Sequence, residues 1–181
     1  MARLTIIVGV AGSGKSSLRR EIARERRIKG FGDATLTNHD DRRRAGRGCL
    51  GELVARLLGR GEDCVMDESH LTMDHFRGLF KGFCDEFLPN VEQEWIFFEN
   101  DALACINNVY HDMYVEVKDR DWLGRLKALR NQSKAYEVPP AGAYPGYQAP
   151  IRVYQQASPR FADKEEAQRW LHDEIERLSG Q

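Results

Sequence analysis

The chain has 181 residues, with 27 Lys and Arg, 28 Asp and Glu and a formal net charge of −1, so its overall charge identifies no class of partner. This length is typical of one domain with a hydrophobic core, and we expect residues 1–181 to form a single domain. No secretion signal and no apolar run of membrane-spanning length is visible, so we expect a cytoplasmic protein without a membrane partner.

The charges are unevenly distributed along the chain. Residues 1–60 contain 14 Lys and Arg against 6 Asp and Glu, whereas residues 61–181 contain 13 against 22. A basic N-terminal region would attract an anionic substrate as well as ATP, and the alternative is a solvated Arg-rich surface. The four cysteines form no C-x-x-C pair or Cys/His cluster, so we expect reduced, mostly buried thiols.

Hydrophobic periodicity predicts strands and helices that alternate along the chain. The predicted strands are residues 3–8, 34–37, 63–66, 91–98 and 151–154. The predicted helices are residues 17–27, 50–58, 73–87, 101–111, 122–134 and 163–178. This alternation indicates an α/β fold with a parallel five-stranded sheet and helices on both faces. Such sheets bind ligands at the carboxyl ends of their strands.

Residues 9–16 read GVAGSGKS and match the phosphate-binding loop pattern G-x-x-x-x-G-K-[ST]. The predicted strand before them and the predicted helix after them are the context that this motif requires. In such a loop, backbone N–H groups surround phosphate oxygens, Lys15 reaches the β- and γ-phosphates, and the Ser16 hydroxyl can bind Mg²⁺. The helix N-terminus adds a favourable partial positive charge. The expected nucleotide-binding residues of this loop are Gly12, Ser13, Gly14, Lys15, Ser16 and Ser17.

An acidic pair followed by arginines comes after the second predicted strand, in residues 38–44 (NHDDRRR). A carboxylate there would face the phosphate loop, and phosphoryl transfer to a hydroxyl uses a base that orients and deprotonates the acceptor. Asp40 or Asp41 could be that base, and the alternative is that one of the two caps a helix. A neighbouring arginine, Arg43 or Arg44, could hold a phosphate on the acceptor through bidentate hydrogen bonds.

The third predicted strand ends in two acids, Asp67 and Glu68. In phosphate-loop proteins an acid at this place commonly holds Mg²⁺, and Asp67 is the first choice. Glu68 is the second choice for the metal, and it could instead position a catalytic water, as in an ATPase. His70 could contact the substrate, although it could also be an ordinary loop histidine.

A basic group surrounds the start of the helix predicted at residue 122. It consists of Lys118, Arg120, Arg125 and Arg130. Small phosphate-loop kinases often place arginines in a mobile lid at this point, where they stabilise charge on the transferring phosphoryl group. We therefore expect a lid at about residues 115–130, with Arg120 and Arg125 as its leading ATP-binding residues. A solvated helix face with charge pairs is the alternative.

Three segments together give the chain a family resemblance. Residues 9–16, 38–43 and 65–71 resemble the kinase domain of phage-type polynucleotide 5′-hydroxyl kinases and related phosphate-loop kinases. The family shows an N-x-D-D-x-R motif in which the first Asp is the general base and the Arg holds a substrate phosphate, which correspond here to Asp40 and Arg43. Residues 122–139 resemble the family's lid helix and the segment that follows it.

The resemblance implies a phosphate-loop NTPase fold of the nucleoside-kinase-like type. It also implies ATP, Mg²⁺ and transfer of the γ-phosphoryl group to a hydroxyl of DNA or RNA, either a 5′ end or a hydroxymethylated base. Residues 105–108 (CINN) depart from the family because they lack its arginine. A nucleotide, sugar or other small molecule is the alternative acceptor, and a non-kinase ATPase is the alternative class; no guanine-recognition motif is visible.

Overall fold

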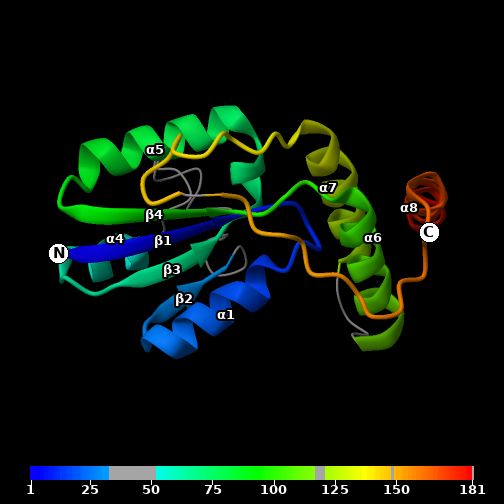
Figure 1. The fold of residues 1–181 in the computed structure, drawn as a ribbon, viewed down its shortest axis with the longest axis horizontal. Coiled ribbons are helices and arrows are strands. Elements are labelled where there is room, and N and C mark those ends of the chain that lie inside the picture. The colour runs from blue at the N-terminus through cyan, green and yellow to red at the C-terminus, as the bar shows by residue number, and fades with distance from the viewer. Residues whose placement is uncertain (33–51, 117–120, 148, 181) are drawn as a thin grey trace.

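A computed structural model describes residues 1–32, 52–116, 121–147 and 149–180 of the chain. The described residues contain one parallel sheet of four strands, which are β1 (Ala2–Val8), β2 (Lys29–Phe31), β3 (Cys64–Asp67) and β4 (Val91–Phe97). The strand order is β2-β3-β1-β4, so the N-terminal strand lies inside the sheet (Figure 1). The parallel α/β sheet predicted from the sequence is therefore confirmed.

The expected five strands become four in the described part of the chain. In place of a strand at 151–154, Ile151 forms a single parallel bridge with Phe98. Its N–H donates to the Phe97 carbonyl and its carbonyl accepts from the Glu99 N–H, both at 2.8 Å. The strand predicted at 34–37 lies outside the described residues, and β2 was not predicted.

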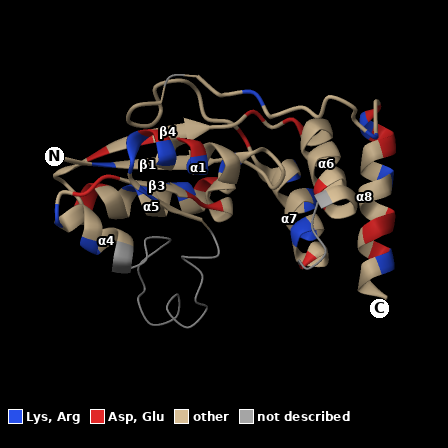
Figure 2. Ribbon diagram, turned by 90° about the horizontal axis from the view of Figure 1, so that it is seen from below, with Lys and Arg blue, Asp and Glu red and all other residues tan. Residues whose placement is uncertain are grey.

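Helices cover both faces of the sheet, as the sequence predicted. Helix α1 (Lys15–Arg26) packs against β3 and β2, whereas α4 (Glu52–Gly59) packs against β1 and β3. Helix α5 (Asp74–Phe87) follows the one-turn helix η1 (Ser69–Thr72) and leads to β4. Right-handed crossovers place α1 on one face and the other two helices on the opposite face (Figure 2).

Three helices form a second group beyond the carboxyl ends of the strands (Figure 1). They are α6 (Ala102–His111), α7 (Trp122–Ala135) and α8 (Lys164–Ser179), and α6 runs into a π-helical turn, η2 (Asp112–Glu116). All three pack against one another. Part of the expected lid, residues 117–120, lies outside the described residues. Of the rest, residues 115–116 belong to η2 and residues 122–130 to α7. The lid therefore stays a prediction.

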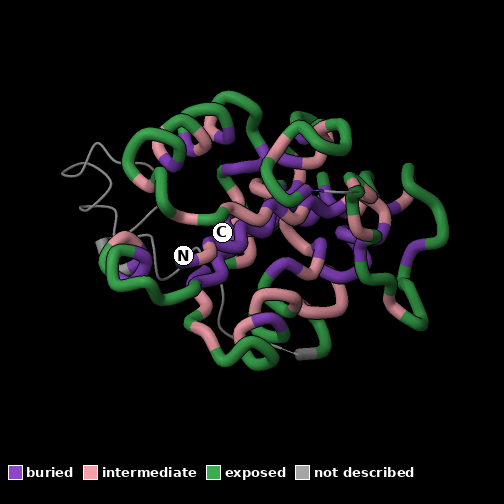
Figure 3. Tube along the Cα trace, turned by 60° about the vertical axis from the view of Figure 1, so that its left-hand side comes forward, coloured by how far each residue is buried: buried purple, intermediate pink, exposed green. Residues whose placement is uncertain are grey.

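The apolar strand residues explain where the core lies. In β1, Leu4, Ile6, Ile7 and Val8 are fully buried, as is expected for a parallel strand covered on both faces (Figure 3). Trp95 and Phe97 of β4 stack on each other with 5.9 Å between ring centroids. The buried strands thus provide a rigid base for the polar residues at their carboxyl ends.

The described cysteines are all buried, namely Cys64, Cys84 and Cys105. Burial raises the pKa of the Cys64 thiol to about 11 and that of Cys105 to about 12, so both are protonated at neutral pH. This fits the expected reduced thiols, while Cys49 lies outside the described residues. Within the described ranges, no helix combines the length and the apolar character that crossing a bilayer requires.

Candidate active site

The phosphate loop turns sharply between β1 and α1 through left-handed glycines. Gly12 has φ +83° and Gly14 has φ +100°, which is backbone geometry that other residues rarely adopt. A Cβ on Gly12 would also lie 2.5 Å from the Cys105 carbonyl oxygen. Helix α1 begins directly after Gly14, so its first N–H groups, which lack intrahelical acceptors, open onto the loop. This is the geometry of an anion-binding site.

Lys15 lies over its own loop. It is 7% exposed, and its Nζ donates a hydrogen bond to the Val10 carbonyl at 3.0 Å. The ammonium therefore lies at the mouth of the loop where phosphate oxygens would bind.

Ser16 and Asp67, the two predicted metal ligands, are in contact. The Ser16 hydroxyl donates to Asp67 Oδ2 at 2.8 Å, and Arg19 Nε lies 2.5 Å from Asp67 Oδ1. The strand register explains this contact, because Ile7 near the end of β1 pairs with Asp67 at the end of β3. The carboxylate is 2% exposed and so is held in a fixed position.

The Ser16–Asp67 pair fits the requirements of Mg²⁺. A hydroxyl and a carboxylate are both hard oxygen donors. No group of three or more His, Cys, Asp or Glu that could hold a metal occurs within the described ranges. Two protein oxygens suffice for Mg²⁺ because this ion usually keeps several waters and binds phosphate oxygens of the substrate.

Glu68 and His70 form a pair on the other side of the β3 end. Glu68 is fully buried, and its Oε1 accepts from the His70 backbone N–H at 3.1 Å and lies 2.7 Å from His70 Nδ1. Glu68 therefore caps η1 and orients the imidazole. The His70 side chain is 45% exposed, which leaves its ring able to meet a substrate.

The phosphate loop opens into a cavity of about 940 Å³, a size suited to a nucleotide. Arg125 lies in its wall together with the loop residues Gly12 to Ser17. Its Nη2 donates to Asp112 Oδ2 at 2.6 Å, and its guanidinium lies 5.4 Å from the centroid of the Trp122 ring. The structure thus brings Arg125 and the phosphate loop to the same cavity. Other lining residues are Arg20, Phe98, Asn108, His111, Ile151, Arg152, Tyr154 and Gln156.

Several predicted site residues lie outside the described residues. They are Asp40, Asp41, Arg43, Arg44 and Arg120. Gly32, the last described residue before the first four, lies close to the proposed metal ligand, since a Cβ there would be 2.9 Å from Asp67 Oδ1.

Two buried carboxamides that sequence reasoning missed hold the phosphate loop from outside. Asn108 Nδ2 donates to the Gly12 carbonyl at 2.8 Å and to the Tyr154 carbonyl at 2.7 Å. Gln132 Oε1 accepts from the Ala11 N–H at 2.9 Å. In the CINN segment, where the family arginine is lacking, the chain thus places an asparagine against the loop. Single polar residues inside helices carry no local signal that could have identified them.

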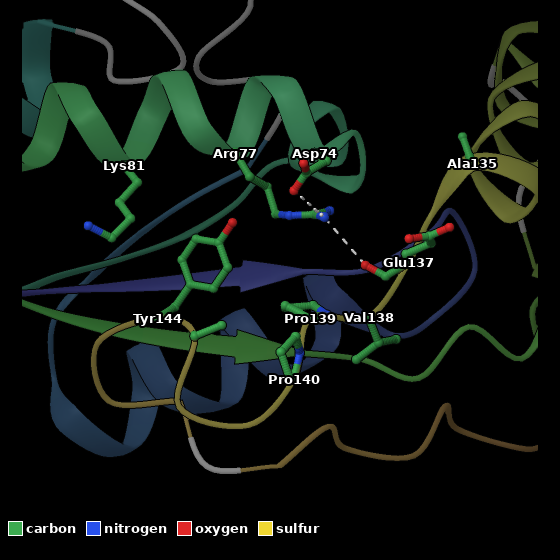
Figure 4. A pocket seen from close by; sticks show the side chains of 10 residues that line it. Asp74, Arg77, Lys81, Ala135, Glu137, Val138, Pro139, Pro140 and Tyr144 are labelled. Carbon is green, nitrogen blue, oxygen red and sulfur yellow. Dashed lines mark hydrogen bonds and ion pairs between the residues drawn. The ribbon is translucent and has the colours of Figure 1, made fainter.

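A second cavity, of about 520 Å³, lies between α5 and residues 135–144, and its lining includes no phosphate-loop residue (Figure 4). The buried Arg77 side chain crosses it and donates to Asp74 Oδ1 at 3.1 Å and the Glu137 carbonyl at 3.3 Å. The same guanidinium donates to the Leu71 and Thr72 carbonyls. Arg77 therefore joins η1 and α5 to the segment after α7.

Solved structures that resemble this chain have the same fold at low sequence identity. The protein APE1195 is 16% identical with a TM-score of 0.54, covering 98% of this chain and 96% of its own. A candidate kinase from Chloroflexus aurantiacus j-10-fl is 14% identical with a TM-score of 0.52, covering 97% of each chain. A sugar kinase from Janibacter sp. HTCC2649 is 13% identical with a TM-score of 0.51, covering 98% of this chain and 92% of its own.

These likenesses show that the chain has the same α/β fold as these proteins. Neither a protein-family model nor a curated protein matches the sequence. The resemblance to polynucleotide kinases, and with it a nucleic-acid substrate, finds no support among the structures named above.

Proposed function

We propose that this protein is an ATP-dependent kinase that transfers the γ-phosphoryl group of ATP to a hydroxyl of a small molecule. The observation that carries the proposal is the 2.8 Å contact between Ser16 of the phosphate loop and Asp67 at the end of β3. It joins a triphosphate-binding loop to a buried carboxylate of the type that holds the nucleotide's metal ion.

On the nucleotide side, the residues act mainly by position and charge. The N–H groups of residues 12–17 and the Lys15 ammonium would bind the phosphate oxygens. Mg²⁺, when bound by Ser16 and Asp67 with ATP, would neutralise charge on the β- and γ-phosphates. Arg125, held by Asp112 in the same cavity, would donate to the phosphoryl group as negative charge shifts during transfer.

On the acceptor side, the proposed residues come from two segments. Asp40 would orient the acceptor hydroxyl and take its proton, with Asp41 as the alternative base. Arg43 or Arg44 would hold an anionic group of the acceptor. His70, oriented by Glu68, would contact the acceptor from the end of β3.

The class of acceptor is inferred from fold similarity and weighed against a sequence motif. A sugar kinase shares the fold over 98% of this chain, which favours a polyhydroxylated small molecule. The N-x-D-D-x-R motif in residues 38–43 is the observation that favours the second candidate, a hydroxyl of a nucleic acid. A non-kinase ATPase would need no acceptor at all.

Incubation with γ-labelled ATP and Mg²⁺ tests these readings against a panel of acceptors. The panel contains sugars and sugar acids, nucleosides, 5′-hydroxyl oligonucleotides and DNA with hydroxymethylated bases. We expect label in one small-molecule class, and no label with the Lys15→Ala variant purified in parallel. Label only in oligonucleotides would support the nucleic-acid reading, and phosphate release without any labelled acceptor would contradict a kinase.

A further inference from the structure

One side chain contacts both halves of the proposed site. Gln132, on α7 and 8% exposed, accepts a hydrogen bond from the Ala11 N–H through Oε1 at 2.9 Å. Its Nε2 donates to the Ser69 carbonyl at 3.3 Å. Ala11 lies inside the phosphate loop, and Ser69 begins η1 directly after the β3 end.

These two contacts bridge segments that are distant in the sequence. Gln132 is 121 residues from Ala11 and 63 residues from Ser69. The loop binds the nucleotide, whereas the β3 end carries Asp67 and leads to His70. A single planar amide therefore fixes the separation between the nucleotide half and the turn that leads to the acceptor half.

The same helix also carries the arginine of the nucleotide cavity. Arg125 and Gln132 are separated by seven residues, which is about two helical turns and places them on the same side of α7. Arg125 lines the cavity while Gln132 ties the helix to the loop and to η1. A shift of α7 would thus move three parts of the site together.

We propose that Gln132 is a positioning residue that holds the phosphate loop and the β3–η1 turn at a fixed distance from each other during phosphoryl transfer. The proposal rests on the proposed kinase function. Transfer requires the phosphoryl group and the acceptor to be held close to their reacting geometry, and a displacement of about 1 Å can cost about 10²-fold in rate. Gln132 does not line the nucleotide cavity, so its loss should act on kcat more than on nucleotide binding.

Three variants separate this role from simple stabilisation. Gln132→Met keeps a similar side-chain length and removes both hydrogen bonds. Gln132→Glu keeps an acceptor for the Ala11 N–H and removes the donor to the Ser69 carbonyl. Lys134→Met is the matched control, because Lys134 is exposed on the same helix.

The measurements are kcat and KM for both substrates, MgADP affinity by calorimetry, and amide hydrogen exchange of residues 9–16 and 69–72. For Gln132→Met we expect kcat to fall about ten- to 10²-fold, with KM for ATP and MgADP affinity within about threefold of wild type. For Gln132→Glu we expect a wild-type exchange rate at Ala11 but a reduced kcat. The control should behave as wild type.

Each other outcome decides against the proposal. A wild-type kcat in Gln132→Met, or in Gln132→Glu, would show that the bridge to Ser69 is dispensable. Equal losses of MgADP affinity and kcat would assign Gln132 to nucleotide binding alone. If wild type itself transfers no phosphoryl group, the kinase proposal fails separately. The role of Gln132 is then tested by amide hydrogen exchange alone. MgADP should slow the exchange of residues 69–72 in wild type and not in Gln132→Met. Equal slowing in both proteins would overturn the proposal.

Discussion

The nucleotide half of the site and its acceptor half are built in different ways. The proposed nucleotide half centres on a run of consecutive residues, Gly9 to Ser16, between a buried strand and a helix, to which β3 and α7 add Asp67 and Arg125. The proposed acceptor half would instead draw on two segments that are distant in the sequence, residues 40–44 and the end of β3. A contiguous loop carries its own geometry in its backbone, whereas a composite surface depends on every element that brings its parts together.

Loss of the loop lysine should have the largest effect and should act on the nucleotide half alone. Lys15→Ala removes the ammonium at the mouth of the loop, and we expect kcat/KM for ATP to fall about 10³-fold because a preorganised charge is lost. The thermal unfolding midpoint should change little. Lys29→Ala, at an exposed lysine of β2, is the control. Turnover at the wild-type rate in Lys15→Ala would refute the assignment of the loop.

Neutralising the proposed base should instead leave the nucleotide half intact. Asp40→Asn should lower kcat roughly 10²-fold or more, because the amide cannot accept the proton of the acceptor hydroxyl. MgADP affinity, measured by calorimetry, should stay unchanged. Asp41→Asn is the matched comparison, and a larger loss in that variant would move the base by one position. A large loss of MgADP affinity in either variant would contradict the division of the site into two halves.

The features predicted from the sequence are those that neighbouring residues determine. The loop motif by itself predicts Lys15 and Ser16 as residues of the nucleotide site. The helices predicted at residues 73–87 and 101–111 match α5 and α6 to within one residue at each end. The contact of Ser16 with Asp67 was also predictable, because adjacent parallel strands end at the same edge of the sheet.

The features that were missed depend on contacts between distant segments. The three-residue strand β2 contains Gly30 at its centre and forms only because β3 pairs with it. Ile151 makes a single bridge to Phe98, and the chain after it lines the nucleotide cavity. Gln132 and Asn108 are single amides on helices, and only the assembled fold shows that they reach the phosphate loop.

An ion pair away from the strand ends should affect stability without affecting either half of the site. Glu94 of β4 accepts hydrogen bonds from Arg26 Nη1 at 2.6 Å and from the Thr5 hydroxyl at 2.7 Å, and so joins β4 to α1 and β1. The Arg26 guanidinium holds the pKa of the Glu94 carboxyl below its usual value, and the Thr5 hydroxyl adds to this effect, while burial opposes it. The pair is partly exposed, with side chains 35% and 27% accessible, so solvent weakens it.

Glu94→Gln should therefore lower the free energy of unfolding at pH 7 by about 0.5–1 kcal/mol, with kcat and both KM values unchanged. Because the folded pKa is lower than the unfolded one, this stabilisation is complete above the unfolded value of 4.5 and disappears as pH falls through the folded value. Urea unfolding of both proteins between pH 7 and pH 3 measures the difference. Glu92→Gln, which alters the more exposed pair with Arg3, is the control and should show a smaller change. A difference between wild type and Glu94→Gln that grows toward low pH would contradict the direction of the pKa shift, since protonation removes the charge that the glutamine lacks.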